Sequence, residues 1–415
     1  MTNFKQQINK LIDFYSKKNL NKNFQYSLLD NAFSNEDIIK GIEVLISKKI
    51  TMGEITRRFE YEFAKYLNVK YALMVNSGSS ANLLSSFALV NPKKENHLRR
   101  NDEFLIQSLC WSTSLWPLVQ AGLKPKFVDV NLENLNIDEN LLFESITKKT
   151  KAALIVHVLG SCSNIKKISR TLKEKKIFLI EDTCESLGAK YNSKYLGTYG
   201  DFGTYSFYYS HQITSGEGGM IVCNNKNDYQ IINSLRAHGW DRNLKKAKEA
   251  QRSFNFINSG FNVRPLDVTA AIGLNQFKRL NKFKKIRDDN RKKIIKELRD
   301  AKAWKQQLYF LNHSNQLEPS WFGLPILIDK KYLKFKKKYL NILNKNKIET
   351  RPILSGNFMN QKSIDLYQLN PKKIIYKNAQ EIEDRGFFIG LHTTPLSKES
   401  VQILVKNLLL IDKIK

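Results

Sequence analysis

Residues 71–84 read YALMVNSGSSANLL, an apolar run that leads through a turn rich in Ser and Gly into a helix-forming segment. The same texture recurs downstream, where short runs of Val, Ile, Leu and Phe alternate with polar segments of helical character. These runs cover residues 104–109, 126–130, 152–159 and 177–180. Continuous apolar runs are typical of strands covered on both faces, so the sequence predicts an α/β fold with a mostly parallel sheet.

The segments that flank these runs predict the domain organisation. Ser34 and Asp37 have the spacing of a capping box and precede apolar residues at helical intervals, so a helix is expected there, after an ill-defined tail. A long polar helix is expected at 275–302. Beyond it the pattern predicts strands at 320–328 and 349–354, and helices at 331–346 and 398–414. We therefore expect a tail (1–25), a large domain (26–285) and a smaller C-terminal α+β domain (286–415).

The chain of 415 residues carries 68 Lys and Arg against 39 Asp and Glu, a net charge of +29. This excess is compatible with nucleic acid, an acidic membrane surface or phosphorylated ligands. The lysines at 334–338 lie beside an apolar helical stripe, so a solvated helix face explains them better than a nucleic-acid patch. No DNA-reading motif, secretory signal or apolar run of transmembrane length is present. We expect a cytoplasmic protein that binds neither nucleic acid nor membrane.

Four cysteines, Cys110, Cys162, Cys184 and Cys223, are spread widely along the chain. Their spacing gives neither a disulfide framework nor a CxxC metal motif. A reducing compartment is expected, without a structural zinc or an iron–sulfur cluster.

Two segments place polar groups where a predicted strand ends. Gly78 and Ser79 stand at the turn after the first run, where free backbone N–H groups at a helix start can form an anion cup. Such a turn can equally be an ordinary loop. Asp182 and Glu185 follow the run at 177–180, at the sheet edge where ligands of open α/β sheets collect. An Asp at that position can equally cap the next helix.

The segment at 203–220 reads GTYSFYYSHQITSGEGGM and is the most informative. Ser206 ends a predicted strand, and His211 stands five residues later, before a turn rich in Gly. A lone histidine is more often structural than functional. The neighbouring segments favour a functional role here.

Together, these segments resemble the DegT/StrS-type sugar aminotransferase family, which uses pyridoxal phosphate on the aspartate-aminotransferase-like fold (fold type I). The phosphate loop, the strand-end carboxylate and the cofactor-lysine segment of that family occur here in the same order. In one position the chain departs from the pattern, because His211 stands where the family carries the cofactor-binding lysine. An imidazole cannot hold the aldehyde of the cofactor covalently, but it can take and return protons near neutral pH.

With a histidine at this position, the chain resembles the nucleotide-sugar 3-dehydratases of the family. One branch of these enzymes holds an iron–sulfur cluster through cysteines that follow the glycine-rich turn, and needs a reductase. Residues 236–262 contain no Cys, so the resemblance favours the cluster-free branch without a reductase partner. It implies pyridoxamine phosphate as the working cofactor, GDP-4-keto-6-deoxy-D-mannose as substrate and glutamate as amino donor. The alternatives are a CDP-linked substrate, an aminotransferase adapted to a histidine, and a catalytically silent DNA-binding regulator.

The resemblance also implies a role for each candidate site residue. His211 is the expected catalytic base and acid, and Asp182 is expected to face the pyridine nitrogen, with Glu185 near the ring hydroxyl. Trp111 is expected to stack on the pyridine, with an ordinary core aromatic as the alternative. The phosphate is expected to contact Gly78, Ser79, Ser206 and, from the neighbouring subunit, Asn262. The active unit is thus expected to be a homodimer with shared sites. Three arginines are weaker candidates for a diphosphate or carboxylate, with surface arginines as the alternative: Arg242, Arg264 and Arg351.

Overall fold

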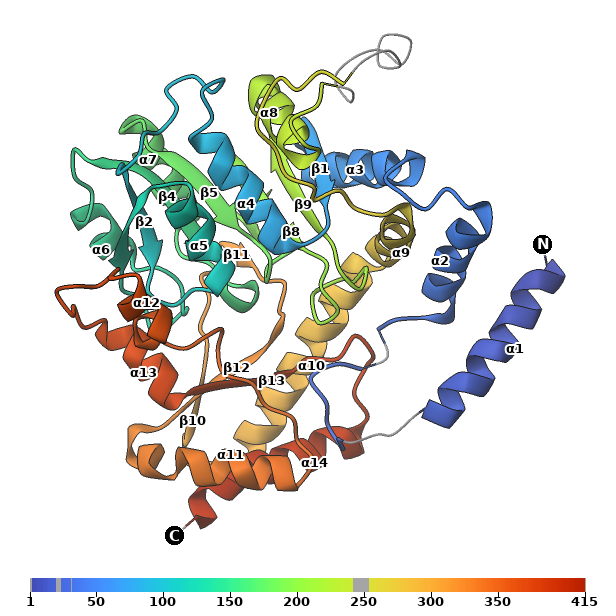
Figure 1. Cartoon of the computed structure of the whole chain (residues 1–415). Coiled ribbons are helices and arrows are strands. Elements are labelled where there is room, and N and C mark those ends of the chain that lie inside the picture. The colour runs from blue at the N-terminus through green and yellow to red at the C-terminus, as the bar shows by residue number, and fades with distance from the viewer. Residues whose placement is uncertain (1, 20–23, 31, 242–253, 415) are drawn as a thin grey trace.

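The structure is a computed structural model that describes residues 2–19, 24–30, 32–241 and 254–414. Its centre is a seven-stranded sheet in the order β1-β9-β8-β5-β4-β2-β3 (Figure 1). Strands β3, β2, β4, β5 and β8 run parallel, and β9 runs antiparallel to both of its neighbours. The predicted α/β fold with a mostly parallel sheet is confirmed. The strands are β1 (Tyr71–Val75), β2 (Glu103–Gln107), β3 (Lys124–Val128), β4 (Thr150–Val156), β5 (Phe178–Asp182), β8 (Phe202–Ser206) and β9 (Gly219–Cys223).

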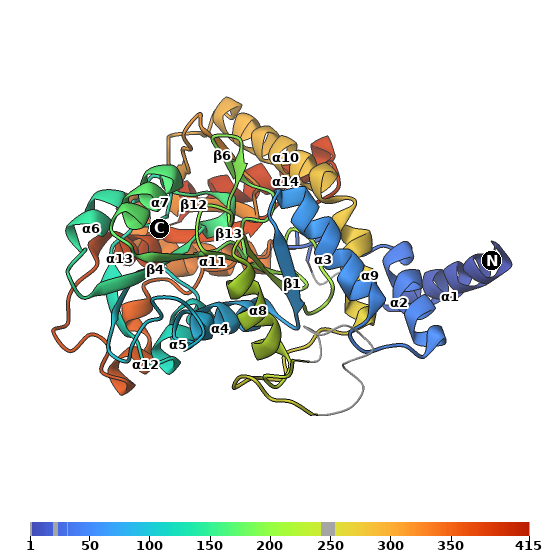
Figure 2. The same cartoon turned by 90° about the horizontal axis from the view of Figure 1, so that it is seen from above.

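Successive residues of the strands pack on opposite faces of this sheet, as the pleat requires. On β4, Leu154 belongs to a core with residues of α4, α5 and α8, whereas Ile155 belongs to a second core with α6 and α7. A third core joins α3, α9 and the start of α10 to β1 and β8. Figure 2 shows α4, α5 and α8 along one side of the sheet. The helices are α3 (Glu54–Leu67), α4 (Gly78–Leu89), α5 (Ser112–Gln120), α6 (Glu139–Glu144), α7 (Ile165–Glu174), α8 (Lys226–Arg236) and α9 (Asp267–Phe277).

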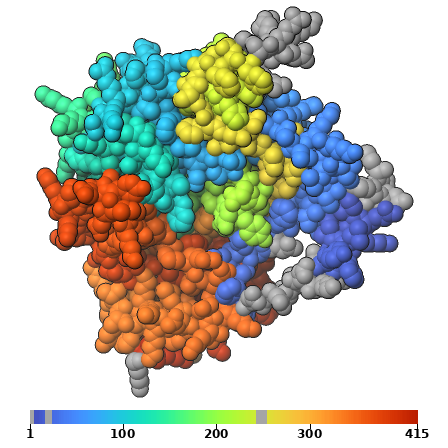
Figure 3. Space-filling model, viewed as in Figure 1, coloured from blue at the N-terminus to red at the C-terminus, as the bar shows by residue number. Residues whose placement is uncertain are grey.

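The C-terminal part of the chain forms a second layer against the first (Figure 3). Three antiparallel strands pair in the order β10-β12-β13 and are flanked by helices. The elements are β10 (Leu308–Phe310), β12 (Gly323–Ile328), β13 (Gly386–Gly390), α10 (Leu280–Asp300), α11 (Lys336–Lys345), α12 (Lys362–Leu366), α13 (Lys377–Arg385) and α14 (Lys398–Leu408). A small sheet of β6 (Lys190–Tyr191), β7 (Lys194–Tyr195) and β11 (Leu317–Glu318) completes the strands described, and 3-10 turns occupy η1 (Val158–Gly160), η2 (Lys330–Phe335), η3 (Phe358–Asn360) and η4 (Leu409–Lys413).

Two predicted elements differ from the structure. The single helix expected at 275–302 is divided, because α9 packs against α2 (Asn35–Ser47) and α3 whereas α10 turns toward α14. No strand forms over the described residues 349–354, so that prediction is wrong. Glu349 is held by the N-terminal segment through its backbone N–H, which donates to the Tyr26 carbonyl at 2.9 Å, and only Arg351 forms an isolated bridge, to Phe388. The chain then turns at Leu354, which has a positive φ of 48°.

The N-terminal segment is more ordered than the sequence suggests. It contains helix α1 (Thr2–Asn19), which lies beside α2 (Asn35–Ser47) in Figure 1. The predicted capping box of α2 is confirmed, since Ser34 and Asp37 exchange side-chain to backbone hydrogen bonds. Residues 25–30 run along the C-terminal layer, where the backbone N–H of Tyr26 donates to the carbonyl of Lys347 at 3.1 Å. The domain boundaries themselves stay predictions. No helix of the described residues is long and apolar enough to cross a membrane.

Candidate active site

A cavity of about 950 Å³ opens at the carboxyl ends of β4, β5 and β8. The last residue of each of these strands lines it: Val156, Asp182 and Ser206. This edge is where open α/β sheets bind their ligands, because the loops diverge there and helix N-termini point toward the gap. The cavity is closed from the other side by the C-terminal layer and by the segment at 27–30.

Asp182 is fixed by three donors. Its Oδ2 accepts hydrogen bonds from Nδ2 of Asn82 at 2.8 Å and from Oγ of Ser114 at 2.7 Å, and its Oδ1 accepts one from the backbone N–H of Cys184 at 3.2 Å. All these partners donate, so the side chain is held as an acceptor. A carboxylate held in this way at the cavity wall can bind a cationic or proton-donating ring nitrogen.

Helix α4 begins at Gly78, the position at which the sequence predicts an anion cup. Ser77 caps this helix, with its Oγ accepting from the backbone N–H of Ser80 at 3.0 Å. A Cβ at position 78 would lie 2.6 Å from Cβ of Ser206 and 2.9 Å from Sγ of Cys184, so only glycine allows the strand end and the helix start to approach this closely. Ser79 also lines the cavity, and its Oγ lies 2.8 Å from Oγ1 of Thr113. Free N–H groups and hydroxyls therefore converge on one spot that suits a phosphate.

Glu185 lines the same cavity. Its Oε2 accepts a hydrogen bond from the backbone N–H of Leu159 at 3.0 Å. Burial raises the pKa of Glu185 to about 8; the Leu159 bond lowers it in part, and the charge of Asp182 raises it further. At neutral pH this side chain is therefore mostly protonated and can donate a hydrogen bond to an oxygen in the cavity.

His211 enters the cavity from the loop after β8. Its ring packs edge-on against Phe322, with ring centroids 5.1 Å apart, and against Tyr208 at 5.9 Å. Burial lowers the pKa of His211 to about 3, and the guanidinium of Arg287 contributes. The imidazole is thus neutral at pH 7 and can accept a proton. Its buried Nδ1 has no hydrogen-bond partner among the described residues. None of the described residues that line this cavity is a lysine.

The structure does not bring all the predicted residues together. Trp111 lines the cavity and is 53% exposed, which rules out the alternative of an ordinary core aromatic. Asn262 lies outside this cavity, and its exposed side chain accepts a hydrogen bond from Nε of Arg264 at 3.0 Å. Arg351 lines the cavity, whereas Arg264 does not and Arg242 lies outside the described residues.

Sequence reasoning missed the residues that support Asp182. Asn82 and Ser114 are buried polar residues inside apolar helices, and this mismatch with the surrounding helix face was the available signal. It also missed the segment at 27–30, which reaches the cavity only through tertiary packing and has no motif of its own.

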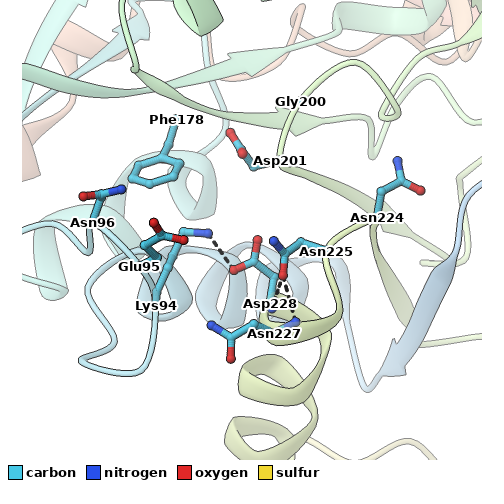
Figure 4. Close-up of a pocket in the computed structure, with 10 residues that line it drawn as sticks. All are labelled: Lys94, Glu95, Asn96, Phe178, Gly200, Asp201, Asn224, Asn225, Asn227 and Asp228. Carbon is cyan, nitrogen blue, oxygen red and sulfur yellow. Dashed lines mark hydrogen bonds and ion pairs between the residues drawn. The ribbon is translucent and has the colours of Figure 1, made fainter.

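A second cavity, about 370 Å³, lies at the opposite edge of the sheet, beside the first residues of β5 and β8 (Figure 4). Its lysine, Lys94, is buried and ion-paired with Asp228 at 2.6 Å, with the ammonium 4.7 Å from the centre of the Phe178 ring. This cation is therefore already neutralised by its partner. The candidate active site is the larger cavity.

A mostly parallel seven-stranded sheet with a fixed aspartate and an anion cup at its carboxyl edge defines the aspartate-aminotransferase-like fold of pyridoxal-phosphate enzymes. Within this class, the chain belongs to the DegT/DnrJ/EryC1/StrS aminotransferase family, which it matches over residues 32–409. The resemblance to that family is therefore confirmed.

One relative found by sequence and two solved structures are similar to the chain. It is 39% identical over 365 residues to the GDP-4-keto-6-deoxy-D-mannose 3-dehydratase of Escherichia coli O55:H7, covering 86% of this chain and 92% of that protein. A solved structure of the E. coli enzyme with bound hydrated PLP has a TM-score of 0.85 at 36% identity, covering 93% of this chain and 99% of that one. A GDP-4-keto-6-deoxymannose-3-dehydratase with a trapped PLP-glutamate geminal diamine has a TM-score of 0.83 at 36% identity, covering 92% and 100%.

Proposed function

We propose that the chain removes the C3 hydroxyl of GDP-4-keto-6-deoxy-D-mannose to give a 4-keto-3,6-dideoxy sugar. In this proposal the cofactor is pyridoxamine phosphate, and glutamate restores its amine form after each turnover. The observation that carries the proposal is His211, which lies in a cavity with Asp182 and the anion cup at Gly78, while none of the described lining residues is a lysine. The similarity to dehydratases that bind hydrated PLP and a PLP-glutamate adduct supports it.

The residues of the cavity fit this cofactor. Gly78, Ser79 and Ser206 would hold the phosphate through N–H groups and hydroxyls, and Asp182 would accept the proton of the pyridine nitrogen. Glu185, protonated near neutral pH, would donate to the ring hydroxyl, and the half-exposed Trp111 would stack on the ring. When bound, the cofactor supplies an amine for the sugar ketone and a ring that accepts an electron pair.

His211 would move the protons of the reaction. The neutral imidazole would accept a proton at its free ring nitrogen, and as imidazolium it would return that proton to the departing C3 hydroxyl, which would leave as water. A lysine at this position would instead bind the aldehyde covalently. The packing of the ring against Tyr208 and Phe322 would hold the imidazole in place for this exchange.

The proposal includes a homodimer with shared sites, in which Asn262 of one subunit reaches the phosphate of the cofactor in the other. Support comes from the exposure of Asn262 and its distance from the cavity of its own chain. Sedimentation of the purified protein, with and without Asn262→Ala, tests this part. We also propose a cytoplasmic location and no reductase partner. The four cysteines are unpaired, which fits a reducing compartment.

The decisive experiment offers the purified protein GDP-linked and CDP-linked 4-keto-6-deoxy sugars, each with pyridoxamine phosphate and glutamate, and analyses the sugars by mass spectrometry. We expect a product that has lost the C3 oxygen, from the GDP-linked substrate, with stoichiometric conversion of glutamate to its keto acid. A sugar that gains nitrogen would assign the chain to the aminotransferases instead. Preference for the CDP-linked sugar would overturn the proposed nucleotide.

A further inference from the structure

A buried arginine of α10 connects the C-terminal layer to the loop of His211. Arg287 is only 2% exposed, and its Nε donates to the carbonyl of Leu391 at 3.0 Å. Its Nη2 donates to the carbonyl of His211 at 3.4 Å. Among the described residues, no carboxylate lies within ion-pair distance of this guanidinium. A buried cation that bonds only to neutral carbonyls is costly, so a purely structural role would be served better by a neutral side chain.

The neighbouring residue of the same helix face shows that docking does not need this charge. Asn290, one turn further along α10, donates to the carbonyls of His392 and Thr394 at 3.1 and 2.8 Å, and accepts from the backbone N–H of Leu396 at 3.0 Å. This neutral amide already fixes the segment after β13 against α10. The contribution that remains specific to Arg287 is the bond to His211 and the positive charge beside it.

We propose that Arg287 is a positioning residue for His211: it fixes the histidine loop against α10 and disfavours a second positive charge on the imidazole in the resting site. This inference rests on the proposed function, in which His211 must begin as a base. It is consistent with the lowered pKa of His211, which burial and then Arg287 produce. Arg287 itself stays protonated at neutral pH, because burial lowers its pKa only to about 10.

Carboxylates on the other elements around the cavity act against this charge. Those that are ionised would favour an imidazolium at position 211, whereas the protonated Glu185 would not, so the arginine balances the charged groups in the resting site. Arg351 adds positive charge among the lining residues, and the phenol ring of Tyr208 packs edge-on against His211, with ring centroids 5.9 Å apart. The acidic groups that line the cavity are Asp30, Asp182, Glu185, Glu217 and Glu349. Removing Arg287 should therefore move the titration of His211 to higher pH.

The test compares Arg287→Met, which keeps much of the volume without the charge, with Arg287→Lys, which keeps the charge. The readout is ring ¹⁵N NMR of histidine-labelled protein, with and without cofactor, and the His211 signal is assigned by its absence in His211→Asn. In the wild type we expect His211 to stay neutral down to at least about pH 5. In Arg287→Met its titration midpoint should rise by about one unit or more, and in Arg287→Lys it should stay near that of the wild type.

Arg291→Met is the matched control. Arg291 lies one turn along the same helix, also donates to a carbonyl, that of Leu311 at 2.9 Å, and stacks over Trp321. Its loss should leave the titration of His211 unchanged. An unchanged midpoint in a folded Arg287→Met protein, or an equal shift in Arg291→Met, would overturn the inference. Should the Met variant not fold, Arg287→Gln provides the same comparison.

The titration needs no turnover, so its failure is distinct from failure of the proposed dehydration. As a second readout, the acid limb of the pH–rate profile for dehydration should move to higher pH in Arg287→Met. Its turnover number should fall about tenfold with little change in KM, because the group affected moves protons and does not bind the sugar. A loss confined to KM would contradict the positioning role.

Discussion

Asn82 of α4 donates its side-chain amide to Asp182 of β5 at 2.8 Å, while its amide oxygen accepts from the hydroxyl of Thr204 on β8 at 2.6 Å. The bond from Thr204 orients the amide, so its NH₂ group must face Asp182. Since an NH₂ group can only donate, Asp182 is held as the acceptor that a protonated ring nitrogen requires. One helix and two strands thus cooperate to set the state of one carboxylate.

Asp182→Asn should lower dehydration by about 100-fold or more, because a neutral amide cannot keep the ring nitrogen protonated. The measurement is turnover with GDP-4-keto-6-deoxy-D-mannose, together with cofactor absorbance to show that the site is still filled. Asp201→Asn is a control at the opposite edge of the sheet and should change turnover by no more than about twofold. Unaltered turnover of Asp182→Asn with cofactor bound would remove the role assigned to this residue.

His211→Lys should allow covalent capture of pyridoxal phosphate while abolishing dehydration. The introduced amine can condense with the aldehyde, but its higher pKa makes it a poor proton acceptor until that bond forms. Absorbance and borohydride reduction followed by mass spectrometry would detect the bond. His211→Asn should show neither the bond nor turnover. Dehydration that persists in the lysine variant would contradict the mechanism.

Gly78→Ala should weaken cofactor binding by about tenfold or more, because the added methyl group would collide with Ser206 and Cys184 and force α4 away from the strand end. The dissociation constant of the cofactor, from fluorescence or calorimetry, checks this. Ser79→Ala removes one hydroxyl without adding volume, so its effect should be smaller. Equal affinities for Gly78→Ala and the wild type would show that the phosphate lies elsewhere.

Glu185→Gln should make the stability of the cofactor-free protein less dependent on pH between 5 and 8. The pKa of Glu185 is raised to about 8 in the folded state, so its contribution to stability is fully present below the unfolded value near 4.5 and is lost as the pH rises through 8. A glutamine carries no such titration and can still accept the bond from Leu159. As the pH rises from 5 to 8, the Tm of the wild type should therefore fall relative to that of the variant. Parallel Tm curves across this range would exclude the shift.

The alternation of short apolar runs with helix-forming segments was enough to predict the parallel sheet, because a strand buried on both faces has a local signature. The motifs at Gly78, Asp182 and His211 were also readable, since each couples a strand end to a turn within a few residues. The helix predicted at 275–302 forms over most of its length as α10 but is divided from α9, and the strand predicted at 349–354 does not form; both differences have the same reason. Both depend on partners that are distant in sequence, α14 in the first case and Tyr26 in the second.

By itself, the sequence determined the class of sheet, the order of the motifs and the replacement of a lysine by His211, because these are properties of local residue type and spacing. The tertiary structure decided the environment of these groups. Asn82, Ser114 and Arg287 act on the site across long separations in the chain, and only the packed fold fixes their distances. Burial and neighbouring charges, which set the proton affinity of Glu185 and His211, arise from that packing and have no counterpart in the linear chain.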